Sequence, residues 1–364
     1  MVALQRRNHA FLHGLRRETI SLRVTLRQIA EATGYSNESV SGVLGSRAHL
    51  FSVETRERIR AAARELGYRP NHAARATRSG KFLNVGVLHA TDVKHDPMPA
   101  SLLTAVAIEL DRRGYHLSFA SWDSRSLNDP EAGPRLLREA MCDGMLIHHA
   151  HEATPAIEAA VRGSTLPVVW LNVNRRHDCV RPDDETAGRD AARCLLDAGH
   201  RRLAYVCASY DKDGRHYSAD DRRRGFEAQA HAAGLEPWII DGTRVPRDQW
   251  MQAALGWLGN IDPRPTAIAC YGGEAVGLLH AAERMGLRVP DDLSILAFGP
   301  WKRGYIDTFL TGPRIDDDAI AAAAADMLVG KIENPAAGPV TPAPCVRVPM
   351  PMHIGGSVAP PHTP

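Results

Sequence analysis

Three short segments near the N-terminus carry apolar residues three or four positions apart, the spacing of a helix that buries one face. Thr25 starts a capping box ahead of the first segment, Gly34 is predicted to end that helix, and Ser36 is predicted to cap the second. The apolar positions, helix by helix, are Leu26, Ile29 and Ala30, then Val40, Val43 and Leu44, then Ile59, Ala62, Ala63 and Leu66. Short helices joined by a glycine-containing turn predict a helix-turn-helix.

From Leu83 onward, short β-rich runs alternate with amphipathic helices, many of which end at a glycine. The predicted strands are Asn84–His89, His116–Ser121, Gly144–His149, Pro167–Asn172, Leu203–Ala208, Trp238–Asp241, Ala267–Tyr271 and Ser294–Phe298. The predicted helices between them include Leu102–Arg113, Thr186–Ala198, Arg224–Ala233 and Ala275–Met285. Repeated strand–helix units predict parallel sheets with helices on both faces. So many strands fit a two-lobed, doubly wound α/β core better than a single sheet.

Charge is divided unevenly along the 364-residue chain, although its formal net charge is only +2. The first 81 residues hold 15 lysines and arginines against 6 glutamates and no aspartate, whereas the remainder holds 29 basic against 36 acidic residues. A basic N-terminal part followed by an acidic body is typical of a nucleic-acid-binding module attached to a domain that does not bind nucleic acid. The alternative is an arginine-rich disordered tail.

Several classes of protein are disfavoured by patterns that the sequence lacks. It has no apolar run of transmembrane length and no apolar segment of secretory type after its basic N-terminus. Its six cysteines are scattered without a CxxC pair, which argues against a zinc site or disulfide scaffold and fits a reducing cytoplasm. His149 and His151 have the spacing of a strand rather than the spacing of metal-binding histidines on a helix, and no metal is expected. Because catalytic and cofactor motifs are missing, we expect a protein that is not an enzyme and has no cofactor. The cysteine pattern and the missing apolar segments lead us to expect a cytoplasmic protein.

Three stretches, Val24–Leu44, Ser52–Ile59 and Glu65–Asn71, closely resemble the DNA-binding headpiece of the LacI/GalR family. The resemblance continues to about residue 350, and its further landmarks are Cys142–Ile147, Gly199–Ala204, Arg222–Phe226 and Gly286–Ser294. It implies a small all-α headpiece, a core of periplasmic-binding-protein type, association into a homodimer and binding of double-stranded operator DNA.

The expected domains combine the periodic patterns with this resemblance. They are a disordered arm or misassigned start at 1–23, a helix-turn-helix headpiece at 24–70, a hinge helix or linker at 71–81, an effector-binding and dimerisation core at 82–350, and a flexible tail at 351–364. Within the core, the first lobe is expected to hold residues 82–184 and 316–340, and the second lobe residues 185–315 and 341–350.

The second headpiece helix is expected to enter the major groove with its N-terminal side chains at base edges. Asn37 can hydrogen-bond adenine, and Glu38 can either accept from the amino group of cytosine or serve as a helix-dipole partner. Gly42 stands where relatives often carry an arginine, which removes a long donor that suits guanine. The other expected DNA contacts are Thr25, Leu26, Ser36, Ser41 and Thr55. Those at helix N-termini can hold phosphates, cap their helices, or do both.

In the family, the segment that matches Asn71–Gly80 is a hinge that becomes helical on DNA and enters the minor groove. The expected contacts there are Asn71, Ala74, Arg75, Thr77 and Arg78. Thr77 stands where a leucine wedge is expected, and it is smaller, polar and β-branched. We therefore expect a shallower DNA kink than a leucine produces. Arg75 and Arg78 are expected to supply more of the affinity by contacting phosphates or a narrow minor groove.

Lobes of this type bind ligands where the carboxyl ends of their strands meet. The resemblance places Arg222 and Asn172 at effector-binding positions, the alternatives being a surface ion pair and a strand-end cap. Sugar-binding relatives carry an Asn-Asp pair and an aspartate where this chain has Gly272-Gly273 and Gly299. Because carboxylates and amides recognise sugar hydroxyls, an ordinary sugar effector is not expected. The further candidate effector contacts are Trp122, His148, Tyr271 and Trp301.

The function expected from these patterns is repression of transcription by a homodimer that a small molecule controls from between the lobes. Three other interpretations stay open. They are an effector-independent or activating regulator with a vestigial cleft, a solute-binding module without regulatory role, and a doubly wound hydrolase or isomerase. The basic headpiece and the missing signal peptide disfavour the second, and the missing catalytic constellation disfavours the third.

Overall fold

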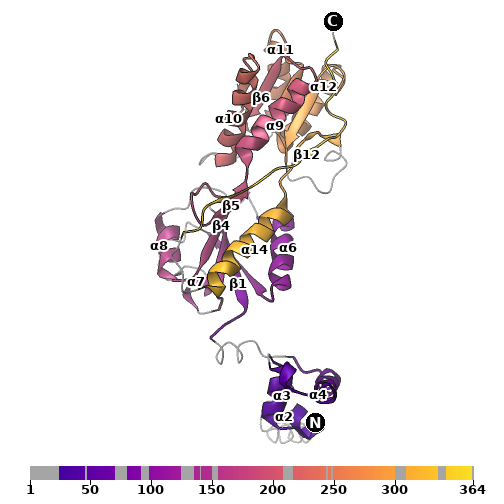
Figure 1. Cartoon of the computed structure of the whole chain (residues 1–364). Helices are drawn as coiled ribbons and strands as arrows, with labels where there is room; N and C mark the ends of the chain where they lie inside the picture. Colours follow the sequence, from indigo (N-terminus) through magenta and orange to yellow (C-terminus); the bar gives the residue numbers. More distant parts are fainter. Residues whose placement is uncertain are drawn as a thin grey trace, which may run out of the picture. The chain divides into compact units, whose positions relative to one another are not determined.

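The computed structural model divides the chain into two units, Met1–Gly80 and Lys81–Pro364 (Figure 1). The residues that it describes are 24–45, 47–69, 80–91, 98–123, 135–139, 141–149, 155–207, 216–242, 245–246, 249–299, 309–334 and 342–362. The predicted arm at 1–23, the predicted hinge contacts at 71–79 and Trp301 lie outside these residues. Among the described helices, none is both long enough and apolar enough to cross a lipid bilayer.

The first unit is built from short helices around a small apolar centre. Its elements are α2 (Leu26–Thr33), α3 (Asn37–Val43), the short 3-10 helix η1 (Ala48–Leu50) and α4 (Val53–Glu65). Thr25 and Gln28 form the predicted capping box of α2, and the Ser36 hydroxyl accepts from the Ser39 N–H at 3.1 Å to cap α3. Ile29, Val40 and Ile59 are fully buried, one from each main helix. The predicted helix-turn-helix is confirmed.

Six parallel strands form the sheet of the first lobe in the order β11-β5-β4-β3-β1-β2. The strands are β1 (Asn84–Thr91), β2 (His116–Asp123), β3 (Gly144–His149), β4 (Val168–Leu171), β5 (Cys179–Pro182) and β11 (Val346–Val348). Alternate side chains of β3 pack on opposite faces, since Leu146 joins one apolar cluster and Met145 and Ile147 join another. The covering helices are α6 (Ala100–Arg112) and α14 (Asp317–Glu333) on one face, and α7 (Arg135–Arg138) and α8 (Pro155–Gly163) on the other (Figure 1).

Four parallel strands form the sheet of the second lobe in the order β7-β6-β8-β9. The strands are β6 (Leu203–Cys207), β7 (Trp238–Asp241), β8 (Ala267–Tyr271) and β9 (Ser294–Phe298). The helices are α9 (Asp184–Asp197) and α10 (Tyr217–Ala232) on one face, and α11 (Trp250–Asn260) and α12 (Gly272–Arg284) on the other. The prediction of two doubly wound α/β lobes is confirmed.

Two expectations for the C-terminal part are wrong. Residues 341–350 were expected in the second lobe, but β11 pairs with β5 in the first sheet. A flexible tail was expected from residue 351, but β12 (Met352–His353) pairs antiparallel with β10 (Gly312–Pro313). Ser357 is fully buried, and its hydroxyl donates to the Ile295 carbonyl of β9 at 2.6 Å. Backbone hydrogen bonds therefore fix the C-terminal segment, although its proline- and glycine-rich composition predicts a loop.

Helices α9 and α10 cross at two glycines that leave no room for a side chain. A Cβ atom at Gly188 would lie 2.1 Å from the backbone oxygen of Arg222, and one at Gly225 would lie 2.0 Å from the backbone oxygen of Glu185. A backbone oxygen in a helix cannot yield as the end of a flexible side chain does. The close crossing therefore depends on glycine at both positions.

Gly225→Ala should lower the free energy of unfolding by about 1–3 kcal/mol, because the added methyl group forces α9 and α10 apart. Denaturant unfolding of the full chain measures the loss. The matched control is Gly256→Ala in α11, where a Cβ meets nothing within 4 Å. The control should leave stability unchanged or raise it by up to about 1 kcal/mol. Equal effects of the two substitutions would contradict the close crossing.

Candidate nucleic-acid interface and ligand cleft

Helix α3 presents a polar face to solvent and an apolar face to the headpiece core. Asn37 and Glu38 in its first turn are exposed, whereas Ser41 is half-buried one turn later. Val40 and Val43 on the opposite face are buried. The side chains predicted to meet bases therefore lie together at the accessible N-terminal end of the helix.

The other predicted DNA contacts of the headpiece differ in their local roles. Thr25 and Ser36 are exposed and cap their helices through their hydroxyls. Leu26 and Thr55 are half-buried. Ser52 rather than Thr55 caps α4, because the Ser52 hydroxyl accepts from the Thr55 N–H at 3.2 Å. The capping interpretation thus holds for Thr25 and Ser36. Both residues stand at helix N-termini, where backbone N–H groups can also bind phosphates.

Glu38 has a basic neighbour that sequence reasoning missed. A guanidinium nitrogen of Arg47 lies 3.9 Å from the Glu38 carboxylate, and the two side chains are 55% and 83% exposed. Ion pairs at such exposure contribute little to stability. The pair therefore does not commit the carboxylate of Glu38, which can exchange Arg47 for a base amino group.

Gly42 is buried against an aromatic ring. A Cβ atom there would lie 2.7 Å from Cε2 of Phe51, a residue that follows η1. The ring of Phe51 thus occupies the space where a side chain at position 42 would begin. Sequence reasoning noticed the glycine but not its partner, which lies in the loop between two helices.

In the core, residues at the carboxyl ends of strands link the two lobes. Asn172 follows β4 in the left-handed region at φ +58°, which asparagine tolerates better than most residues. Tyr217 Oη donates to Asn172 Oδ1 at 2.9 Å, and His216 Nε2 donates to the Asn172 carbonyl at 3.2 Å. The predicted effector residue Asn172 is therefore engaged by the start of α10 in the second lobe.

A second contact between the lobes runs through Arg181 of β5. Its guanidinium donates to Asp221 of α10 at 3.1 Å and lies 4.8 Å from the centre of the Tyr217 ring. Both partners of the ion pair are largely buried, at 7% and 13% exposure. Burial on this scale makes the pair stronger than a surface ion pair. Sequence reasoning missed it because the partners are 40 residues apart.

Arg222 lies inside the second lobe rather than on its surface. Its Nε donates to Asp184 Oδ1 at 2.7 Å, with side chains only 4% and 0% exposed. The guanidinium lies 4.6 Å from the ring centre of Tyr271 and 5.3 Å from that of Phe298. Burial tends to lower the pKa of Arg222, but Tyr271 and Asp184 oppose this and the pKa stays above its usual value. Arg222 is thus a permanent cation, held by a carboxylate and two rings.

Tyr271, at the end of β8, contributes a neutral hydroxyl at the same edge. Burial raises the pKa of Tyr271 to about 12 although Arg222 opposes the rise, so the phenol keeps its proton at neutral pH. Its hydroxyl oxygen lies 3.0 Å from the Ser218 hydroxyl. Asp184 Oδ2 and the Tyr205 hydroxyl are buried and have no hydrogen-bond partner among the described residues. These groups form a buried aromatic cluster that contains a few polar atoms, with only Tyr271 partly exposed.

The predicted contacts His148 and Trp122 lie in the first lobe. His148 is buried and pairs in register with His89, their Nδ1 atoms being 3.2 Å apart. One ring must donate and the other accept, so at least one of these nitrogens carries no proton. Trp122 is 3% exposed and packs in the cluster under α7 and α8. Within the described residues, no group of three or more His, Cys, Asp or Glu side chains is placed to hold a metal.

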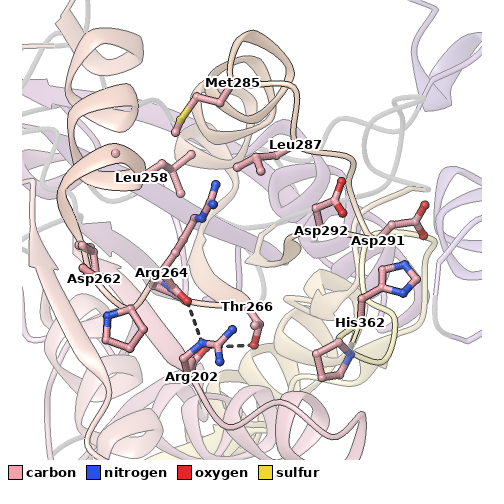
Figure 2. A pocket seen from close by; sticks show the side chains of 15 residues that line it. Arg202, Leu258, Asp262, Arg264, Thr266, Met285, Leu287, Asp291, Asp292 and His362 are labelled. Carbon is pink, nitrogen blue, oxygen red and sulfur yellow. Dashed lines mark hydrogen bonds between the residues drawn. The ribbon is translucent and has the colours of Figure 1, made fainter. Parts of the chain in front are cut away.

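A cavity of about 680 Å³ in the second lobe lies away from these groups (Figure 2). Arg202 and Thr266, which line it, precede β6 and β8, so the cavity is at the amino ends of the strands. Arg202 Nε donates to the Arg264 carbonyl at 3.0 Å. Ligands of doubly wound sheets bind at the opposite, carboxyl ends. The cavity is therefore distinct from the predicted effector contacts Asn172 and Tyr271, which lie at the carboxyl ends of β4 and β8.

Two family models match the chain. The model of bacterial regulatory proteins of the lacI family matches residues 25–71, and the model of the periplasmic binding protein-like domain matches residues 192–358. The first match covers the three headpiece helices. The second covers most of the second lobe and continues through α14 and β11.

Similar proteins and structures agree with these matches. A protein of Mannheimia succiniciproducens called HTH-type transcriptional repressor PurR is 27% identical over 284 residues, which are 75% of this chain and 81% of that one. A Klebsiella pneumoniae protein of the same name is 26% identical and spans 85% of this chain and 91% of its own.

Among solved structures, the lac repressor dimer bound to operator and an anti-inducer has a TM-score of 0.70 at 21% identity, covering 93% of this chain and 99% of that one. The regulator CelR in complex with cellobiose has a TM-score of 0.60 at 21% identity, covering 92% and 100%. These two likenesses concern the fold. Taken with the helix-turn-helix and the two-lobed core, the matches show a headpiece similar to bacterial regulatory proteins of the lacI family, followed by a core similar to periplasmic binding proteins.

Proposed function

We propose that this protein represses transcription by binding operator DNA through α3 and responds to a small molecule bound between its lobes. The observation that carries the proposal is the exposed first turn of α3, where Asn37 and Glu38 project from a helix anchored by a buried core. The relatives named as transcriptional repressors support repression rather than activation. Residues 24–70 are proposed as the headpiece and 71–81 as its link to the core.

A homodimer is proposed on an apolar surface of the first lobe. Leu103 and Ile108 of α6 line an open groove of about 540 Å³, and Ile108 is 48% exposed. Phe119, on the edge strand β2, is 46% exposed. Exposed apolar side chains beside an open sheet edge indicate a surface that another chain covers. A second copy of this chain is the proposed partner, because a palindromic operator needs two headpieces.

The proposed effector is less hydroxylated than a sugar. At the carboxyl ends of the strands, the second lobe presents the partly exposed ring of Tyr271, behind which lie the buried ring of Phe298 and a cation that Asp184 already pairs. Sugar recognition uses uncommitted carboxylates and amides. Here the amide of Asn172 is bonded to Tyr217. A ligand with an aromatic or otherwise planar part fits these side chains better.

Asn37→Ala should weaken binding to the preferred duplex by about 1–3 kcal/mol, because a bidentate base contact is lost, while binding to unrelated duplex stays the same. The duplex is first selected from a random library with the full chain, and affinity is then measured at several salt concentrations. The logarithm of affinity should fall steeply with the logarithm of salt concentration. The control is Asn260→Ala at the exposed end of α11. Absence of any selected sequence would refute the proposed function.

Ile108→Asp should convert a dimer into a monomer, because it places a charge in an apolar interface. Sedimentation velocity measures the change, and operator affinity should fall with it. Ile354→Asp is the matched control, since Ile354 is an exposed isoleucine outside α6, with 71% of its surface accessible. If both variants kept the mass of a dimer, the α6 surface would not be the interface.

A metabolite that occupies the cleft should raise the unfolding temperature, since a ligand at 100 times its Kd adds about 2.7 kcal/mol of stability. The shift should be lost in Asn172→Ala, which removes the hydrogen bond that Tyr217 donates from the second lobe to the first, and kept in Asn260→Ala. A thermal-shift screen that includes planar nitrogen compounds and sugars tests this. A shift produced by sugars alone would contradict the proposed ligand class, and no shift at all would favour an effector-independent regulator.

A further inference from the structure

Two cysteines lie against each other where the first lobe leads into the second. Cys179 opens β5, and Cys345 immediately precedes β11. The strands are parallel neighbours with Val180 opposite Val346, so the two cysteines stand one step before this pair. Neighbouring strands are about 4.8 Å apart, and disulfides form between residues whose Cα atoms are about 4.4–6.8 Å apart. Both side chains belong to one apolar cluster, and each thiol shifts the pKa of the other.

The environments of the two thiols differ in a way that suits stepwise oxidation. Cys345 is half-buried, and the Cys179 thiol together with Arg181 and Arg347 lowers the pKa of its thiol. Cys179 is fully buried, and the Cys345 thiol and its own desolvation raise the pKa of its thiol. A thiolate near cations is the form that peroxides attack. Cys345 is therefore the reactive sulfur and Cys179 the resolving one.

Three other cysteines lie in environments that make them poor targets for peroxide. Burial raises the pKa of Cys142, Cys194 and Cys270. Cys194 is half-buried like Cys345 but has an acidic neighbour, Asp197, in place of arginines. It therefore provides an internal comparison of similar burial and opposite charge.

Both strands run directly into the connections between the lobes. Asp183, between β5 and α9, donates its N–H to the Val348 carbonyl of β11 at 2.8 Å. Beyond β11, the Pro351 carbonyl accepts from the Arg314 N–H at 3.0 Å ahead of β12. A covalent bond between the strands would join two of the segments that must bend when the lobes move.

We propose that Cys179 and Cys345 are a peroxide-sensitive dithiol whose disulfide fastens β5 to β11 and restrains the movement of the lobes. The Cys345 thiolate attacks one oxygen of hydrogen peroxide, the O–O bond breaks, and the leaving hydroxide takes a proton to become water. The resulting sulfenic acid is attacked by the sulfur of Cys179, whose proton leaves with the hydroxyl group as a second water. The two thiols lose two electrons, which the peroxide gains.

The chemistry is tested on the reduced full chain by titration with hydrogen peroxide, alkylation of remaining thiols and mass spectrometry of the digest. A peptide pair joined through Cys179 and Cys345 should accumulate at about tenfold less peroxide than modifies Cys194, and dithiothreitol should reverse it. Cys179→Ser should leave a sulfenic acid on Cys345 that dimedone traps, and Cys345→Ser should leave Cys179 reduced. Cys194→Ser is the control and should behave as the parent protein.

The mechanical part is tested by hydrogen exchange and thermal unfolding of the oxidised and reduced forms. The amide of Asp183 should exchange several-fold more slowly after oxidation, and the unfolding temperature should rise by several degrees, because the disulfide closes a long loop. Neither change should occur in Cys345→Ser. Absence of the linked peptides, or oxidation of Cys194 at the same peroxide concentration, would overturn the dithiol. Unchanged exchange at Asp183 would overturn its effect on the lobes. All these outcomes are independent of DNA binding.

Discussion

The buried ion pair of Arg222 and Asp184 is the interaction on which the second lobe's contribution to the cleft depends. Breaking such a pair on one side costs about 3–5 kcal/mol, because the remaining charge is left without water or partner. The pair therefore requires α9 and α10 to stay as close as Gly188 and Gly225 allow. With α10 fixed in this way, its first residues meet Asn172 and Asp221 meets Arg181. A constraint inside one lobe thus determines how that lobe contacts the other.

The headpiece and most of the strands can be predicted from the sequence because their signals are local. The capping box at Thr25 and the cap at Ser36 act within three residues, and β3, β7, β8 and β9 begin and end where the apolar runs do. Prediction failed where partners are distant. The short β5 and β11 were missed, since they pair with each other although they lie far apart along the chain. The polar first turns of α10, Tyr217–Arg223, carried too little apolar periodicity to be recognised.

The candidate sites show the same division. The pattern located Asn37 and Glu38 on an exposed helix end, but it gave no sign of Arg47 beside Glu38. In the cleft it identified Asn172, Arg222 and Tyr271 as residues and missed the partners that define their chemistry. Asp184 in particular turns Arg222 from a free cation into half of an ion pair. An arginine's capacity to hold a ligand depends on a neighbour that only the fold brings near.

The contact between Gly42 and Phe51 bears on how recognition in this headpiece can diverge. The ring lies against bare backbone, and an arginine at 42 has no place for even its first carbon while a phenyl group stands there. A side chain at 42 therefore requires the ring of Phe51 to shift or a smaller residue to stand at 51. The effects of substitutions at 42 and 51 on the stability of the headpiece are therefore expected to depend on each other.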